Sequence, residues 1–204
     1  MKLPLFAASL LALLCTSAPA QIAPPSNRTP SHQEFSIQAS GDLTRKITSN
    51  GVTYRPDPSM GVFATYRYNF MHWLGAEAEY NYQQTTQVYT VAGAKTSIDA
   101  DAHALGAAAV FQFSNPLAKS IRSFVTVGGG ATLFEPRNAP GLPQQWRNTI
   151  LIGGGEDIPL SRRLLVRIQI SSATYKAPDF GFTTLHTNKY MQTVTPAAGL
   201  AFRF

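Results

Sequence analysis

The sequence predicts an all-β protein, an eight-stranded antiparallel up-and-down transmembrane β-barrel preceded by a cleavable signal peptide. Eight segments of about ten residues alternate apolar and polar side chains with a period of two, which is the period of a β-strand. The connections between these segments are alternately short and long. After the signal, no run approaches the ~18 consecutive apolar residues that a spanning helix needs.

Residues 1–20 have the features of an export signal. Lys2 is followed by an apolar run, and Ala18-Pro19-Ala20 forms an A-x-A cleavage site. Cleavage would remove Cys15 and leave a mature chain without cysteine. A lipoprotein anchored through Cys15 is the alternative, but Leu14 stands where such sites prefer a small residue.

The remaining chain divides into two parts. Residues 21–33 are rich in proline and serine and predict a flexible lead-in. Residues 34–204 are long enough for one domain, the barrel itself. The net charge of +6 comes from scattered basic residues, so export and the absence of a cluster argue against nucleic acid as a partner.

β-Branched, aromatic and small residues dominate the eight predicted strands. These strands are 34–41, 60–70, 73–84, 101–113, 122–134, 146–157, 163–174 and 191–204. The short connections are 71–72, 114–121 and 158–162, and the long ones are 42–59, 85–100, 135–145 and 175–190. Short connections on one side and long ones on the other are typical of a membrane barrel.

The two faces of each strand differ in polarity. In 163–174, one face is apolar, with Leu164, Val166, Ile168 and Ile170, and the other carries Arg167, Gln169 and Ser171. A soluble sandwich or a lipocalin-like barrel also alternates, with its apolar face inward. A membrane barrel is favoured because the polar faces combine glycine and alanine with charges of both signs, as a narrow lumen requires. These charges are Arg67, Glu77, Glu79, Arg167 and Arg203.

Aromatic residues gather at the ends of the strands. Beside the short turns stand Phe70, Phe111, Phe113, Phe202 and Phe204, and beside the long connections stand Tyr80, Tyr82, Phe134, Tyr175 and Tyr190. Two aromatic belts around an aliphatic band are expected where a barrel crosses both membrane interfaces.

Residues 34–204 resemble the eight-stranded outer-membrane β-barrel family of bacteria, the OmpA/OmpX-type small barrels. The resemblance is strongest in "GGGEDIPLSRRLLVRIQI" (153–170) and in the terminal "GLAFRF". It implies a location in the bacterial outer membrane, among its lipids and lipopolysaccharide. It also implies that Phe202 and Phe204 form the signal read by the barrel insertion machinery. Separately, no cofactor is expected.

The inward charges are the candidate site. Arg67 and Glu77 should approach each other across the 70–73 turn, directly opposite or one diagonal step apart. Glu79, Arg167 and Arg203 could join them in a salt-bridge network that fills the lumen. A gated, porin-like pore or a site for a small polar ligand is the alternative interpretation.

No catalytic or metal-binding residues are predicted. The histidines are His32, His72, His103 and His186, and none is followed two positions later by serine. His103, near Asp99 and Asp101, could form a Ser–His–Asp set with Ser171 or Ser172, but strand-end solvated charges explain it more simply. G-x-S-x-G, H-E-x-x-H and phosphate-loop motifs are absent from the sequence.

The expected function is therefore non-enzymatic, structural or surface-interacting, with a lumen closed by polar and charged side chains. The long connections would meet the outside and could contact an extracellular ligand. A monomer is expected. A lipid A-modifying barrel enzyme and a soluble lipocalin-like periplasmic carrier are the alternatives.

Overall fold

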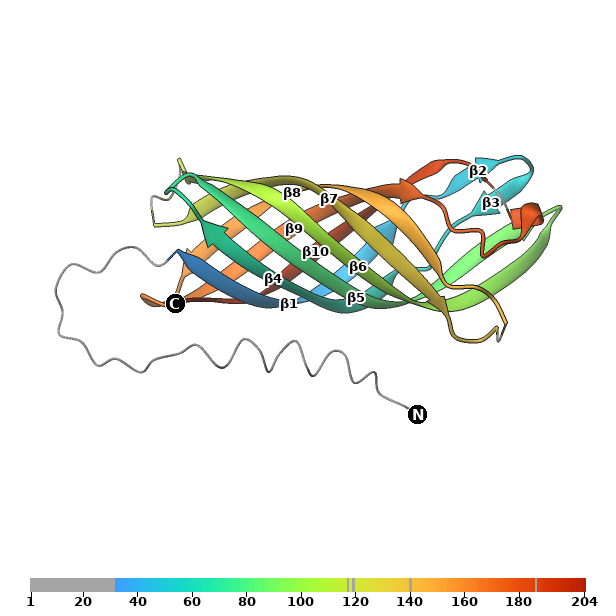
Figure 1. Ribbon diagram of the computed structural model, residues 1–204, viewed down its shortest axis with the longest axis horizontal. Helices are drawn as coiled ribbons and strands as arrows, with labels where there is room; N and C mark the ends of the chain where they lie inside the picture. The colour runs from blue at the N-terminus through green and yellow to red at the C-terminus, as the bar shows by residue number, and fades with distance from the viewer. Residues whose placement is uncertain (1–31, 117, 119, 140, 186) are drawn as a thin grey trace. The chain divides into compact units, whose positions relative to one another are not determined.

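One antiparallel sheet closes on itself to form a ring of strands (Figure 1). The computed structural model describes residues 32–204, except residues 117, 119, 140 and 186. The predicted signal peptide and residues 21–31 of the predicted lead-in lie outside the described residues. The described elements are β1 (Gln33–Thr44), β2 (Ile47–Ser49), β3 (Val52–Tyr54), β4 (Ser59–Asn69), β5 (Leu74–Val91), β6 (Ala94–Ser114), β7 (Arg122–Pro136), β8 (Gln145–Pro159), β9 (Leu164–Lys176), the short 3-10 helix η1 (Thr183–Leu185) and β10 (Tyr190–Arg203).

The ring runs through eight of the described strands in the order β1, β4, β5, β6, β7, β8, β9 and β10. It closes because β10 pairs antiparallel with both β9 and β1. The end of the chain is held on both sides: the amide of Arg203 donates to the carbonyl of Arg163 at 2.8 Å, and that of Phe204 donates to the carbonyl of Gln33 at 3.2 Å. The predicted eight-stranded up-and-down barrel is confirmed.

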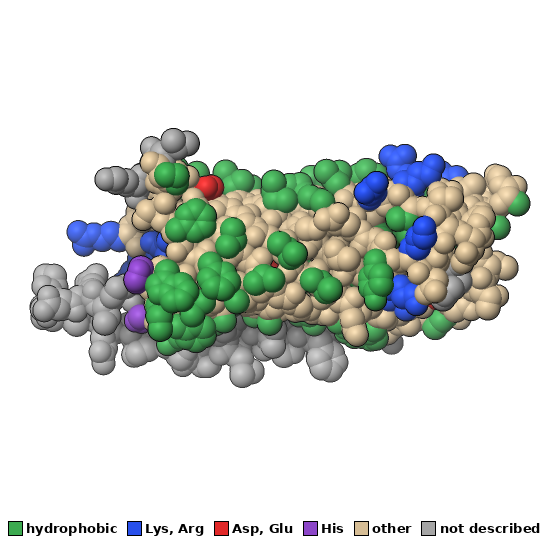
Figure 2. All heavy atoms as spheres, turned by 90° about the horizontal axis from the view of Figure 1, so that it is seen from above, with side chains coloured by type: hydrophobic (Ala, Val, Ile, Leu, Met, Phe, Trp, Pro, Cys, Tyr) green, Lys and Arg blue, Asp and Glu red, His purple; other side chains and the backbone are tan. Residues whose placement is uncertain are grey.

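The outer surface of the barrel is apolar along its middle. In β9, Ile168 and Ile170 are 48% and 58% exposed, whereas Arg167 between them is fully buried. Figure 2 shows apolar side chains spread over the middle of one face, with Lys and Arg towards the two ends. The side-chain alternation therefore directs apolar groups outward and polar groups inward, opposite to a soluble barrel.

Within the described residues, no helix combines the length and the apolarity needed to cross a membrane.

Two of the predicted long connections, 42–59 and 85–100, were wrong because they contain strands. β5 and β6 continue to a tight turn at Ala92-Gly93, whose φ angles are 48° and 86°. β2 and β3 form a second hairpin around Asn50-Gly51, with φ angles of 52° and 73°. Positive φ at both central residues is the geometry of the two-residue turns that match the twist of a hairpin. The β2–β3 hairpin adds to the extended part of β5 through β3.

The predicted aromatic belt beside the long connections was wrong for Phe134 and Tyr175. They are 2% and 7% exposed and pack inside, with ring centroids 5.7 Å apart. The reason is strand parity, since Phe134 shares the inward face of β7 with Thr132, and Tyr175 shares that of β9 with Arg167. Near the short turns the expected exposed aromatic residues are present: Phe70, Phe111, Phe113, Phe202 and Phe204.

Replacing Ile170 by arginine tests which face meets lipid. A cation at mid-depth on the lipid face should lower the free energy of unfolding by about 2–4 kcal/mol. Leu160→Arg is the matched control, because Leu160 is 59% exposed in a short turn, and it should cost at most about 1 kcal/mol. Urea unfolding in phospholipid vesicles, followed by tryptophan fluorescence, measures both. Equal losses would contradict this orientation of the strands.

Candidate functional site: a buried charge cluster inside the barrel

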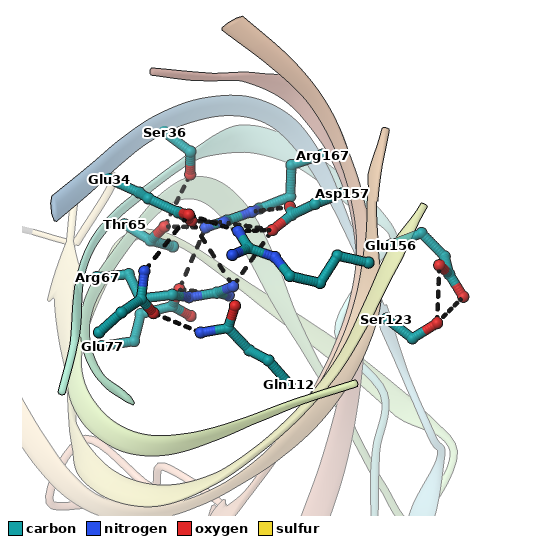
Figure 3. A network of polar contacts seen from close by, with 12 residues as sticks. Glu34, Ser36, Thr65, Arg67, Glu77, Gln112, Ser123, Glu156, Asp157 and Arg167 are labelled. Atoms are coloured by element: carbon teal, nitrogen blue, oxygen red, sulfur yellow. Dashed lines mark hydrogen bonds and ion pairs between the residues drawn. The ribbon is translucent and has the colours of Figure 1, made fainter. Parts of the chain in front are cut away.

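Seven charged side chains converge inside the barrel near the short turns, and we call them the ion-pair cluster. They are Glu34 (β1), Arg67 (β4), Glu77 (β5), Arg122 (β7), Asp157 (β8), Arg167 (β9) and Arg203 (β10). Figure 3 shows Glu34, Arg67, Glu77, Asp157 and Arg167 of this cluster. Their convergence follows from register. The members that face each other on neighbouring strands are direct pairing partners, so they lie at one level of the barrel.

Two short hairpins each supply an arginine–carboxylate pair. In β4–β5, the Nε of Arg67 donates to Oε2 of Glu77 at 2.8 Å. In β8–β9, the Nε and Nη2 of Arg167 donate to the two carboxylate oxygens of Asp157 at 2.7 and 3.0 Å. The second pair is bidentate, the geometry in which a guanidinium binds a carboxylate most strongly. All four side chains are at most 1% exposed.

These two hairpin pairs also contact each other across the interior. Nη1 of Arg167 lies 3.3 Å from Oε2 of Glu77, and Nη1 of Arg67 lies 3.5 Å from Oδ2 of Asp157. The strands involved, β5 with β9 and β4 with β8, lie on opposite sides of the ring. The cluster therefore links opposite walls as well as neighbouring strands.

Glu34 contacts more arginines than either other carboxylate of the cluster. Its carboxylate lies 2.7 Å from Nη2 of Arg167, 2.9 Å from Nε of Arg203 and 3.9 Å from Nη1 of Arg67. It also pairs with Nη2 of Arg122. The Glu34 side chain is fully buried, whereas Arg122 and Arg203 are 27% and 23% exposed. Glu34 thus joins two buried arginines to two that reach the short-turn end.

The aromatic ring of Phe124 packs against the guanidinium groups of the two buried arginines. The Cζ atoms of Arg67 and Arg167 lie 4.1 and 5.2 Å from the centroid of the Phe124 ring, within the range of cation–π attraction. A Cβ at Gly155 would lie 2.8 Å from this ring. Glycine at this position therefore leaves the space that the Phe124 ring occupies.

The structure brings Arg67, Glu77, Arg167 and Arg203 together but leaves Glu79 apart. Glu79 lies farther along β5, and no described contact pairs it with an arginine. A Cβ at Gly106 would lie 3.1–3.2 Å from the Glu79 side chain, so the space beside glycine receives this carboxyl group. The other predicted pair, Phe202 and Phe204, points outward with stacked rings 6.2 Å apart.

Sequence reasoning missed Glu34, Arg122 and Asp157. For two of them, the sequence contained a pattern that could have placed them in the cluster. Glu34 occupies the inward parity of β1 with the buried Ser36, and Asp157 opposes Arg167 across a short turn, as Glu77 opposes Arg67. Arg122 has no partner across a short turn, because Asp157, 3.1 Å away on the paired strand β8, follows a long connection, and Glu34 lies on the opposite side of the ring.

His103 lies on the outer surface rather than in the interior. Its Nδ1 is 2.8 Å from the hydroxyl of Tyr80, and its Nε2 is 4.0 Å from Glu135. Ser171 is buried on the inward face of β9, and the outward Ser172 accepts a hydrogen bond from Gln192 at 2.7 Å. Neither serine joins His103 in a triad. Among the described residues, no group of three or more His, Cys, Asp or Glu could hold a metal ion.

A second buried group, which we call the mouth cluster, lies towards the long connections. It consists of Val52, Tyr54, Tyr89, Ile98, Ala100, Phe134, Tyr175, Ala177, Phe180, Leu185 and Met191. The rings of Tyr54 and Tyr89 are 4.8 Å apart, and the Tyr89 hydroxyl donates to the carbonyl of Pro178 at 2.8 Å. Burial raises the pKa of Tyr89, so its hydroxyl keeps the proton that it donates.

Gln145 fixes the segment that covers this mouth. Its Oε1 accepts hydrogen bonds from the amides of Asp179 and Phe180 at 2.9 and 3.1 Å, and its Nε2 donates to Oδ1 of Asp179 at 2.6 Å. Between the two clusters lies a cavity of about 40 Å³, lined by polar side chains such as Asp42, Gln83 and Thr195 and by the rings of Phe134 and Tyr175.

The closed ring, the apolar outer wall and the ionised interior define a small transmembrane β-barrel. The chain belongs to the outer membrane protein beta-barrel domain family, whose profile matches residues 6–190. The protein is therefore a bacterial outer-membrane barrel. No curated protein sequence matches the chain.

Solved structures of small outer-membrane barrels share this fold at low sequence identity. Neisserial surface protein A (NspA) is 12% identical with a TM-score of 0.59, over 85% of this chain and 98% of that one. OprG of Pseudomonas aeruginosa is 13% identical with a TM-score of 0.55, over 85% and 97%. Ail of Yersinia pestis, the attachment invasion locus protein, is 14% identical with a TM-score of 0.53, over 86% and 100%.

Replacing Glu34 by glutamine should destabilise the barrel strongly. Loss of this carboxylate leaves buried arginine charge without compensation, which costs about 3–5 kcal/mol. Glu156→Gln is the control, because the Glu156 side chain is partly exposed on the outward face of β8 and accepts a hydrogen bond from the Ser123 hydroxyl at 2.9 Å. Gel migration of samples heated to increasing temperatures gives the unfolding temperature of each variant. Identical migration and melting of the two variants would contradict the assigned role of Glu34.

Proposed function

We propose that the protein is a non-conducting outer-membrane barrel with a structural or surface-interaction role. The observation that carries this proposal is the ion-pair cluster, whose side chains meet from opposite walls at one level. Any ion that passed this level would have to separate pairs such as Arg167 and Asp157, 2.7 Å apart, within a narrow interior. Breaking a buried pair costs several kcal/mol, so a permanent aqueous path is disfavoured.

The opposite end supports the same proposal. The mouth cluster buries aromatic and aliphatic side chains where an open pore would admit water. The cavity between the two clusters, about 40 Å³, has room for only a few waters. A lumen closed by polar and charged side chains explains these dimensions better than a gated pore or a polar-ligand site does.

A surface role is proposed for the end that carries the β2–β3 hairpin and the β5–β6 extension. These elements project beyond the paired ring, so they can vary or bind without disturbing barrel closure. Small barrels of this family insert through recognition of a C-terminal aromatic signal, and we assign that role to Phe202 and Phe204. We propose that the protein is a monomer. We also propose that it has no catalytic activity, because the described polar contacts of His103 are with Tyr80 and Glu135 and not with a serine.

Planar-bilayer recordings test the closed interior. The purified protein should give no stable conductance steps at physiological salt, whereas a large porin reconstituted in the same bilayers should. As a matched variant, Arg67→Ser combined with Arg167→Ser and Phe124→Ala should introduce conductance if its heat-modifiable migration shows a folded barrel. Regular channel openings of the wild-type protein would overturn the proposal.

Cysteine labelling of intact cells tests the orientation. In a Cys15→Ser background, a cysteine at Pro143, which is exposed in a long connection, should react with a membrane-impermeant maleimide. A cysteine at Arg162, which is exposed in a short turn, should react only after the outer membrane is permeabilised. The reverse pattern would show that the long connections face the periplasm.

A further inference from the structure

We propose that a basic pocket on the outer wall, between β1 and β10, binds the phosphate-bearing headgroup of an outer-leaflet lipid. This inference rests on the proposed orientation, with the long connections outside. The pocket has a volume of about 440 Å³ and is lined by Arg45, Lys46, Thr48, Thr174, Lys189 and Gln192, among others. No acidic side chain is among the described residues that line it.

The three cations of the pocket are not used elsewhere in the fold. Arg45, Lys46 and Lys189 are exposed, and within the described part of the chain none of them forms an ion pair. By contrast, Arg137 and Arg147 at the same end pair with Asp101 and Asp179 at 3.3 and 3.4 Å. Uncompensated positive charge thus gathers at one place on the wall.

Backbone hydrogen bonds anchor two of these residues, Arg45 and Lys189. The amide of Arg45 donates to the carbonyl of Gln192 at 3.2 Å, and the carbonyl of Lys189 accepts from the amide of Ala177 at 3.1 Å. The side chains therefore project from anchored strand ends rather than from a free loop. A pre-positioned set of donors lowers the entropic cost of binding an anion.

The surface towards the membrane indicates what kind of anion fits. Tyr190 lines the pocket and is 72% exposed, as expected of an aromatic residue at the membrane interface. Farther along the same face, Leu43 on β1 and Ile170 on β9 are 56% and 58% exposed, and both strands pair with β10. An amphiphile would satisfy both regions, with phosphates on the cations and acyl chains along the apolar wall.

Binding of lipid A by the detergent-purified full barrel, measured by native mass spectrometry, tests the proposal. Diphosphorylated lipid A should bind at one site, and the same lipid after enzymatic dephosphorylation should bind at least about tenfold more weakly. Arg45→Gln combined with Lys46→Gln and Lys189→Gln should weaken binding of the diphosphorylated lipid to a similar degree. Arg55→Gln combined with Lys95→Gln and Arg162→Gln removes the same charge elsewhere and should bind like wild type.

Three results would overturn the lipid site. These are equal binding by both triple variants, equal binding of the dephosphorylated lipid, or inorganic phosphate alone binding as tightly as diphosphorylated lipid A. Heat-modifiable migration of both triple variants establishes that each is folded before binding is compared. The cysteine-labelling pattern is measured separately, so a failed orientation is distinguishable from a failed site.

Discussion

Backbone hydrogen bonding across the β1–β10 seam is the interaction on which the rest of the structure depends. Lipid offers no partner to an amide or a carbonyl, and each unpaired group there costs several kcal/mol. The seam runs from Glu34 opposite Arg203 to Thr44 opposite Thr193, and it leaves the ring without an edge. Closure also fixes an inside and an outside, because a slip of one residue would exchange the two faces of a strand.

The seam and the ion-pair cluster depend on each other. Glu34 lies on the first strand of the ring and contacts Arg203 on the last one, so this contact forms only when the ring closes. The same carboxylate then reaches Arg67 and Arg167, one from each arginine-bearing short hairpin. Each hairpin can form its own pair locally, but the cross-barrel contacts require all the walls. Buried charge that is stable only in the closed ring therefore selects the correct closure and register.

Most features that depend on residues close together in the sequence were predicted, whereas most side-chain contacts between residues far apart in the sequence were not. The period-two pattern predicted the strands, and the charges on the polar faces together with the aromatic strand ends predicted the membrane barrel and the outward position of Ile168. The short 70–73 turn predicted that Arg67 would oppose Glu77. The pairing of Glu34 with Arg122 could not be predicted, since it depends on the curvature of the whole ring. The hairpin turn at Ala92-Gly93 was missed because alanine is not a residue that ordinarily indicates positive φ.

Phe134 and Tyr175 were assigned to the wrong face for a reason that concerns the solvent. Inside a membrane the hydrophobic effect does not favour an apolar interior, because lipid is as apolar as the side chains themselves. Beyond the membrane the same strands enter water, and burial of apolar groups is favourable again. A rule that places every aromatic residue outward therefore fails where the strands leave the lipid.

β6 shows this change along a single strand. Near its middle, Leu105 points outward and is 53% exposed, while closer to its beginning Asp99 and Asp101 take the outward parity. The inward face of the same strand does not become acidic: Ile98 is 3% exposed and Ala100 is fully buried. The outward face therefore changes from apolar to acidic without any shift in register, because the surrounding medium changes and the backbone pairing with β5 does not. The change from Leu105 to Asp101 thus marks the depth at which the barrel wall passes from hydrocarbon into water.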